Sequence, residues 1–83
     1  MQLLYFASVR ESTGVSEEKY QLPEGVSNVA QLIEHMRGRG TGYAAAFENT
    51  LMLRVAVNQI HSKPEQVISD TDEIAFFPPV TGG

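Results

Sequence analysis

The chain has 83 residues, six basic and ten acidic side chains, and a formal net charge of −4. This length suits one domain, near the lower size limit at which a hydrophobic core stabilises a fold without disulfides or bound metal ions. The acidic balance argues against nonspecific nucleic-acid binding, which needs clustered lysine and arginine. No apolar run approaches the ~20 residues that cross a bilayer. The chain is therefore expected to bind neither nucleic acid nor a membrane.

Cysteine is absent from the sequence. No disulfide can form, and no thiol chemistry is available from a side chain. The first residues show neither the positive leader nor the small-residue cleavage site of a secretory signal peptide. Both features predict a cytoplasmic protein. His35 and His61 are the only histidines, so a structural zinc site is not expected and no metal ion is predicted.

The first third of the chain predicts a β-hairpin. Residues 2–9 form an apolar run rich in aromatic and aliphatic side chains, which is typical of a strand. Residues 11–16 contain Gly14 and predict a turn. Residues 17–22 predict a second strand that pairs with the first, and the Pro-Glu-Gly sequence at residues 23–25 breaks the chain.

A helix is predicted after this break. Ser27 is a good N-cap candidate because its hydroxyl can accept a hydrogen bond from the first turn. The apolar side chains then follow a helical stripe at i, i+3, i+4 and i+7: Val29, Leu32, Ile33 and Met36. Gly38 and Gly40 are expected to end this helix. Arg37 and Arg39 are interpreted as a solvated helix end near the negative pole of the helix dipole.

The second half of the chain predicts further short elements. Residues 43–48 are alanine-rich and predict a short second helix, and residues 51–58 predict the third strand. Residues 58–64 predict a turn or a short hairpin. Residues 70–72, Asp-Thr-Asp, predict a turn, which explains their carboxylates better than metal binding does. Residues 73–77 predict the last strand.

The order strand, strand, helix, strand, strand predicts one α+β domain. Its mixed sheet would have about four to five strands, with one main helix across one face and a short second helix. This is the β-grasp arrangement of ubiquitin. By analogy with that fold, the first and last strands are expected to lie side by side in parallel at the centre. The predicted domain covers residues 1–77, and residues 78–83 are expected to form an extended tail.

Strand alternation predicts an apolar patch on the side of the sheet that no helix covers. Alternate positions of the two central strands are expected to face the helix: Leu3, Tyr5, Ala7, Ile74 and Phe76. The positions between them place Leu4, Phe6 and Phe77 on the opposite side. A small domain seldom exposes such a patch without a partner, so these three residues are predicted to bind one. A loop that covers the patch is the alternative.

The C-terminal residues predict a stiff, narrow tail. Pro78 and Pro79 cannot donate to a sheet ladder and favour extended geometry, so the strand should end near Phe77. The six residues 78–83 can reach roughly 20 Å. The two final glycines have no Cβ and can pass through a narrow channel. The segment expected to insert into another protein comprises Pro78, Pro79, Val80, Thr81 and Gly82.

The predicted reactive group is the terminal carboxylate of Gly83. A free carboxylate is ionised at pH 7 and is a poor electrophile, so it needs activation. A partner enzyme can use ATP to convert it into an acyl adenylate. Sulfide or a persulfide can then displace AMP and leave a thiocarboxylate. ATP would be used by the activating partner, and no cofactor is expected to bind this chain itself.

The sequence resembles the family of small, sulfur-carrying subunits of molybdopterin synthase, known as the MoaD family. The resemblance runs nearly from end to end. Its most specific segments are Phe-Ala-Ser-Val-Arg-Glu at residues 6–11, Val-Asn-Gln at residues 57–59, and Asp-Glu-Ile-Ala-Phe-Phe-Pro-Pro-Val-Thr-Gly-Gly at residues 72–83.

The resemblance implies a non-catalytic role within a heterotetrameric complex. Gly83 would be adenylated by an E1-like, MoeB-like enzyme, with Gly82 as its spacer. The tail would insert into a MoaE-like large subunit, which supplies the catalytic side chains. Sulfur would pass to a cyclic pyranopterin precursor, where two transfers build the dithiolene of molybdopterin. Phe6 and Phe77 match positions that pack against partners in this family.

Other functions for such a tail stay open at this stage. The sulfur could be delivered to a thiamine thiazole or to a tRNA base, because the partner decides the pathway. Gly83 could instead be joined to lysines on target proteins, as in ubiquitin. A plain interaction domain with an idle tail is a further alternative.

Overall fold

The computed structural model describes residues 1–79. Its helices and strands are short and follow one another closely. In chain order they are β1 (Gln2–Tyr5), α1 (Ala7–Thr13), β2 (Glu17–Lys19), α2 (Val29–Arg37), α3 (Thr41–Glu48), the 3₁₀ helix η1 (Thr50–Met52), β3 (Arg54–Val57), β4 (Ile60–His61) and β5 (Glu73–Phe77).

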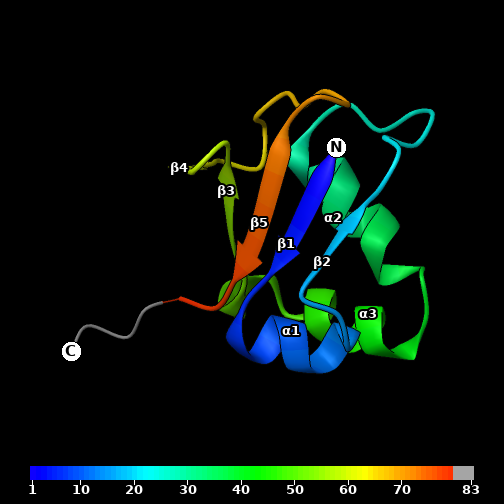
Figure 1. The fold of residues 1–83 in the computed structure, drawn as a ribbon, viewed down its shortest axis with the longest axis vertical. Helices are drawn as coiled ribbons and strands as arrows, with labels where there is room; N and C mark the ends of the chain where they lie inside the picture. The colour runs from blue at the N-terminus through cyan, green and yellow to red at the C-terminus, as the bar shows by residue number, and fades with distance from the viewer. Residues whose placement is uncertain (80–83) are drawn as a thin grey trace.

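The strands form one mixed sheet in the order β2-β1-β5-β3-β4 (Figure 1). β1 and β5 are parallel at its centre, and each other neighbouring pair is antiparallel. The expected parallel central pair is therefore confirmed. The α+β, β-grasp architecture predicted from the element order is also confirmed, with five strands in the sheet.

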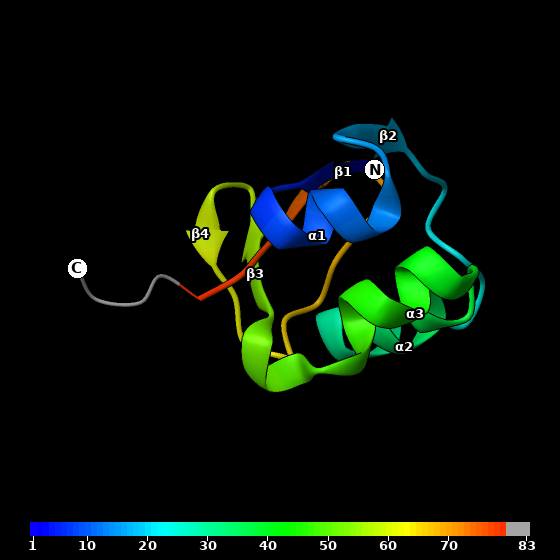
Figure 2. The ribbon, with the colours of Figure 1, turned by 90° about the horizontal axis from the view of Figure 1, so that it is seen from below.

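The helices leave one face of the sheet open. Figure 1 views the sheet from this side, with α2 behind it, and Figure 2 shows α2 and α3 together on the other side. α3 contacts both α1 and α2. We use "covered face" for the side that packs against the helices and "open face" for the opposite side.

The covered face and the helices enclose the core. Phe76 is fully buried, stacks on Tyr5 at a ring-centroid distance of 5.8 Å, and meets Phe47 edge-on at 4.8 Å. The apolar stripe predicted for α2 is confirmed, because Val29 and Leu32 are buried in this core. Within residues 1–79 the buried residues of this core cluster are Leu3, Tyr5, Val9, Val29, Leu32, Met36, Phe47, Leu53, Val55, Val57, Ile68, Ile74 and Phe76.

The first strand is shorter than predicted, because residues 7–13 form a helix. β1 ends at Tyr5, and Phe6 becomes the N-cap of α1. Ala7 has a φ of 50°, in the left-handed region, which costs a residue with a Cβ about 1–2 kcal/mol. The prediction that Ala7 faces the main helix is therefore wrong. A local sequence pattern does not reveal this bend, which is offset by burial of Val9 in the core.

Several predicted boundaries also shift. The turn expected at residues 11–16 is wrong for its first half, which is helical. The second strand ends at Lys19 rather than at residue 22, and the third begins at Arg54 rather than at residue 51. Short strands end where neighbouring strands no longer offer backbone partners, and that depends on the whole sheet.

The N-cap of α2 is Asn28 rather than Ser27. The Asn28 side-chain oxygen accepts a hydrogen bond from the backbone N–H of Gln31 at 2.9 Å. The backbone N–H of Ser27 instead donates to the Gln31 side chain at 2.7 Å. The predicted helix end is confirmed, with Gly38 at the C-cap.

Two tight backbone arrangements position the later elements. A Cβ added at Gly42, in α3, would overlap the backbone carbonyl oxygen of Ser12 in α1. The β3–β4 hairpin turns at Asn58 and Gln59, whose φ values of 51° and 69° are both left-handed. Two such residues are typical of the tight turn that matches the twist of a hairpin. The hairpin predicted within residues 58–64 is thus confirmed.

Candidate functional site: the open face and the root of the tail

The root of the tail lies at the end of the central strand β5. The strand ends at Phe77, and the half-buried Pro78 and Pro79 follow it. The other residues predicted to insert into a partner, together with the reactive residue, lie outside the described part of the chain: Val80, Thr81, Gly82 and Gly83. Their roles stay predictions.

Leu4 and Phe77 lie on the open face. Leu4 stands beside Ala75 across the parallel β1–β5 pair, and Phe77 follows two residues after Ala75 on the same side. Ala56 of β3 is the neighbour of Ala75 on its other flank. Leu4 and Phe77 are both half-buried. Two small side chains, Ala56 and Ala75, therefore share this face with two large apolar ones, Leu4 and Phe77.

Phe6 lies at the same end of the sheet and continues the extended backbone of β1, with φ −124° and ψ 150°. It follows the last residue of β1, and its side chain is 47% exposed. Its backbone N–H donates to the Phe76 carbonyl oxygen at 3.0 Å, which holds it beside the C-terminal end of β5. The bend at Ala7 follows Phe6, so strand alternation still places the Phe6 side chain on the opposite side from Tyr5. Phe6 therefore lies next to the root of the tail.

Two cationic or ionisable side chains near Phe77 were missed by the sequence analysis. The exposed ring of His61, in β4, meets the Phe77 ring edge-on at a centroid distance of 5.4 Å. Arg54, in β3, is the direct cross-strand neighbour of Phe77. Only the register of the sheet brings these residues together, because they are separated from Phe77 by 16 and 23 positions in the sequence.

The aspartates at the opposite end of the sheet have structural roles, because they accept hydrogen bonds from neighbouring segments. Asp72 accepts hydrogen bonds from the Asn58 side chain at 2.9 Å and the Ser69 backbone N–H at 2.8 Å, and these bonds lower its pKa. Asp70 accepts from the Leu22 backbone N–H and the N-terminal ammonium group, which likewise lower its pKa. Within residues 1–79 no cluster of potential ligands could hold a metal ion.

A polar cluster on the covered side corrects the interpretation of Arg39. Its guanidinium is held between the rings of Tyr20 and Tyr43, at 4.1 and 4.2 Å from their centroids, and it forms an ion pair with Glu18. The Glu18 carboxylate also accepts hydrogen bonds from the hydroxyls of Tyr43 at 3.1 Å and Tyr5 at 3.2 Å. Arg39 is therefore not part of a solvated helix end, whereas Arg37 is exposed.

This cluster changes the acidity of its members. Burial first, and the nearby Glu18 carboxylate second, raise the pKa of Tyr5. Burial and the hydrogen bond to Glu18 likewise raise the pKa of Tyr43. For Arg39, burial alone favours a lower pKa, but the contacts with Glu18 outweigh it and raise the value. All three groups therefore keep their protons at neutral pH. Their contacts with Glu18 connect β2 to α3 and to the segment that follows α2.

His35 also has a structural position. Its Nε2 lies 2.7 Å from the hydroxyl of Tyr20, and the residue is half-buried. His61 is exposed. The part of the chain that the structure describes contains no helix long and apolar enough to cross a membrane.

The arrangement places an apolar surface beside the point where the chain leaves the sheet. Three apolar residues lie near the C-terminal end of β5, where Pro78 follows: Leu4, Phe6 and Phe77. Apolar surface of this kind gains free energy when a partner removes it from water. The geometry is suited to holding a partner protein at a fixed position relative to the tail.

Comparison with known proteins places this geometry in a family. The model of the ThiS family matches residues 3–83. The chain is 40% identical to the molybdopterin synthase sulfur carrier subunit of Haemophilus influenzae, covering 100% of this chain and 99% of that protein. It is 37% identical to the protein of the same name from Escherichia coli K12, with the same coverage.

A solved structure supports the fold. SAMP1 from Haloferax volcanii has a TM-score of 0.72 and 23% identity, covering 100% of this chain and 98% of that one. At this identity the likeness concerns the fold. Together with the full-length sequence matches, these findings show that the chain belongs to the ThiS family of ubiquitin-like β-grasp proteins, among relatives named molybdopterin synthase sulfur carrier subunits.

Proposed function

We propose that this protein is the sulfur carrier subunit of a molybdopterin synthase. The observation that carries the proposal is the 40% identity with a protein of that name over the whole of this chain, including its last residues. The Phe-Phe-Pro-Pro-Val-Thr-Gly-Gly ending gives the role a chemical basis, because two glycines without Cβ atoms would offer little steric hindrance to an activating enzyme.

The proposed chemistry exchanges one oxygen of the Gly83 carboxylate for sulfur. A carboxylate oxygen attacks the α-phosphorus of ATP in an E1-like partner, pyrophosphate leaves, and an acyl adenylate forms. Sulfide, or an equivalent donor, then attacks the carbonyl carbon, and AMP leaves with the oxygen. The product is a thiocarboxylate, whose sulfur is nucleophilic. ATP is thus consumed on the partner and is not a cofactor of this chain.

The thiocarboxylate then serves as substrate for a second partner. The large subunit of the synthase would receive the tail and supply the catalytic side chains. The sulfur attacks an electrophilic carbon of a cyclic pyranopterin precursor, where a C–O bond breaks and the oxygen leaves. Water then cleaves the acyl C–S bond of the resulting thioester, which returns the carboxylate of Gly83 and leaves the sulfur on the pterin. Two such transfers build the dithiolene of molybdopterin. This chain therefore acts as a non-catalytic, sulfur-donating subunit.

The described residues support this role by fixing the start of the tail. β5 is flanked by β1 and β3, so the strand that carries the tail is held on both sides. Pro78 and Pro79 restrict the backbone directly after it. Leu4, Phe6 and Phe77 would dock the partner at this point. A rigid start and a docked surface reduce the entropy that a flexible tail would lose on insertion.

The test is a change in the length of the tail. Deletion of Gly83, or addition of one residue after it, should abolish sulfur transfer to the precursor with purified large subunit, because the reactive carbon no longer reaches its position. Thermal unfolding, measured in parallel, should be unchanged, so that a loss of transfer reports on the tail and not on the fold. Dithiolene formation by the shortened chain at the wild-type rate would refute the proposal.

Intact mass separates the other functions of such a tail. A carrier should gain about 16 Da when activated with ATP and a sulfur donor, because sulfur replaces oxygen. Isopeptide adducts through Gly83 would instead indicate a protein modifier. Loss of the added mass on a thiazole precursor or a tRNA, but not on the pyranopterin precursor, would assign the carrier to a different pathway.

A further inference from the structure

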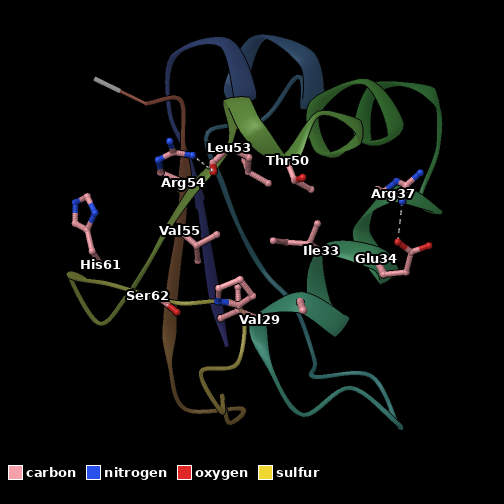
Figure 3. A pocket seen from close by; sticks show the side chains of 12 residues that line it. Val29, Ile33, Glu34, Arg37, Thr50, Leu53, Arg54, Val55, His61 and Ser62 are labelled. Carbon is pink, nitrogen blue, oxygen red and sulfur yellow. Dashed lines mark hydrogen bonds and ion pairs between the residues drawn. The ribbon is translucent and has the colours of Figure 1, made fainter. Parts of the chain in front are cut away.

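A second candidate docking surface lies on the other side of the molecule. It is a groove of about 410 Å³ between α2 and the β3–β4 hairpin. Figure 3 shows Val29 and Ile33 on the helix pointing toward Val55 on the strand across this space. Val55 is the cross-strand neighbour of Phe76, so it belongs to the covered face. The apolar part of the groove therefore lies on the covered side, while two of its lining residues, Arg54 and His61, lie beside Phe77 at the edge of the open face.

The floor and walls of the groove are mainly apolar. Its apolar lining consists of Val29, Ala30, Ile33, Leu53, Val55 and Pro64. Exposed aliphatic residues adjoin both rims: Leu51, in η1, is 80% exposed, and Ile60, in β4, is 72% exposed. Leu51 is the sequence neighbour of the lining residue Thr50, and Ile60 is the sequence neighbour of the lining residue His61.

The charges at the two ends of the groove differ. At one end, Arg37 forms an ion pair with Glu34 at 2.8 Å, which satisfies both groups (Figure 3). At the other end, Arg54 donates only to the backbone carbonyls of Leu51 at 3.2 Å and Leu53 at 3.0 Å. Arg54 has no carboxylate partner within residues 1–79. One end of the groove thus has an arginine available for an anion.

We propose that this groove binds a short aliphatic segment of a partner protein, flanked on one side by an acidic residue that pairs with Arg54. The apolar lining supplies the free energy of burial. A guanidinium binds a carboxylate with two parallel hydrogen bonds, which would fix the direction of the segment. A membrane surface fits less well, because it requires several clustered cations rather than one.

The proposal is independent of the chemistry of the tail. It does not require Gly83 to be activated, so failure of the sulfur-carrier proposal would leave it intact, and the reverse also holds.

The direct test is a titration of the ¹⁵N-labelled full chain with a synthetic peptide, acetyl-Glu-Glu-Val-Ile-Val-Val-amide, followed by NMR. The amides of α2 and of residues 53–55 and 62 should shift, while those of Leu4 and Ala75 should not. The matched peptide with both Glu replaced by Gln should bind the wild-type chain about tenfold more weakly, because it cannot form the ionic pair.

Two pairs of variants locate the site. Arg54→Gln should abolish the difference between the two peptides, whereas Arg37→Gln should preserve it, because Arg37 is already paired with Glu34. Ala30→Glu, on the exposed surface of α2 within the groove, should weaken binding of the acidic peptide at least tenfold. Ala45→Glu, on the exposed surface of α3, is the matched control and should bind normally.

Several results would overturn the proposal. These are equal affinity of the wild-type chain for both peptides, shifts confined to the open face, or a dissociation constant above about 1 mM for the acidic peptide. Tighter peptide binding after removal of residues 80–83 would identify the chain's own tail as the occupant. Concentration-dependent self-association that Ala30→Glu abolishes would instead identify a second copy of the chain.

Discussion

The two faces of the sheet differ in how deeply their side chains are buried. On the covered face, Leu3 and Phe76 are fully buried and contribute to the core. On the open face, Leu4 and Phe77 are their immediate neighbours in the sequence, yet both stay half-exposed. Because strand side chains alternate, adjacent residues can be assigned to stability and to binding. A substitution's effect should therefore depend on its position within the strand more than on its chemistry.

The largest expected contrast is between Phe76→Ala and Phe77→Ala. Removing the buried Phe76 ring should cost about 3–5 kcal/mol of unfolding free energy, because it leaves a cavity against Tyr5 and Phe47. Removing Phe77 should cost about 1 kcal/mol. Urea denaturation of both variants measures the difference.

Partner binding should show the reverse order. Phe77→Ala should weaken binding of the large subunit about tenfold, as expected for an aromatic contact near the centre of an interface. Calorimetry on the folded variant measures this. Unchanged affinity together with a large loss of stability would place Phe77 in the core and remove it from the docking surface.

The covered face also depends on how closely the helices approach one another. Gly42→Ala should destabilise the protein by about 1–3 kcal/mol, since the new methyl group would overlap the Ser12 carbonyl and force α1 and α3 apart. Gly38→Ala, where a Cβ finds its nearest neighbour at 3.5 Å, is the matched control and should change stability less. Equal melting temperatures for the two variants would contradict the close contact.

A third contrast involves adjacent residues of the edge strand β2. Glu18→Ala should cost about 1–2 kcal/mol, because Arg39, Tyr5 and Tyr43 each lose a hydrogen-bond acceptor in a half-buried site. Glu17→Ala, at the exposed neighbouring position, should stay within about 0.5 kcal/mol of wild type. Thermal unfolding of the two variants compares them directly, and similar losses would show that the cluster does not stabilise β2.

The smallest expected effect is acid sensitivity from the turn at the far end of the sheet. The pKa values of Asp70 and Asp72 are lower in the folded state than the ordinary aspartate value. Their stabilising contribution is therefore complete above the unfolded pKa of about 3.9 and is lost as the pH falls through the lower folded values.

Melting temperatures between pH 6 and pH 2.5 test this effect. The wild-type chain should lose stability in the lower part of this range, and Asp72→Asn should show a shallower decline together with a lower starting value. Glu65→Gln, an exposed residue outside this turn, is the control. A decline in Asp72→Asn that matches the wild type would exclude Asp72 as a source of the pH dependence.

The prediction from sequence succeeded where one periodicity governed a whole segment. The stripe from Val29 to Met36 gave the main helix, and residues 73–77 gave the central strand with its boundaries. It failed at residues 6–9, where an apolar run continued from strand into helix without a local break. The bend at Ala7 requires a left-handed backbone that alanine disfavours, so no composition rule anticipates it.

The candidate site also contains residues that the sequence pattern predicted and residues that only the sheet register brought together. Leu4 and Phe77 could be assigned to the open face by counting along the strands, and the register agrees. His61 and Arg54 could not be found in this way, because their proximity to Phe77 depends on which strands are neighbours. The environment of Arg39 between two tyrosines was hidden for the same reason.

The sequence by itself determined the elements with a regular pattern, the β-grasp order and the chemical character of the chain end, because each depends on residues that are close together along the chain. The tertiary structure alone decided the bend at Ala7, the burial of Arg39, and the groove between α2 and the β3–β4 hairpin. Those features depend on backbone strain offset by packing, and on contacts between residues far apart in the sequence.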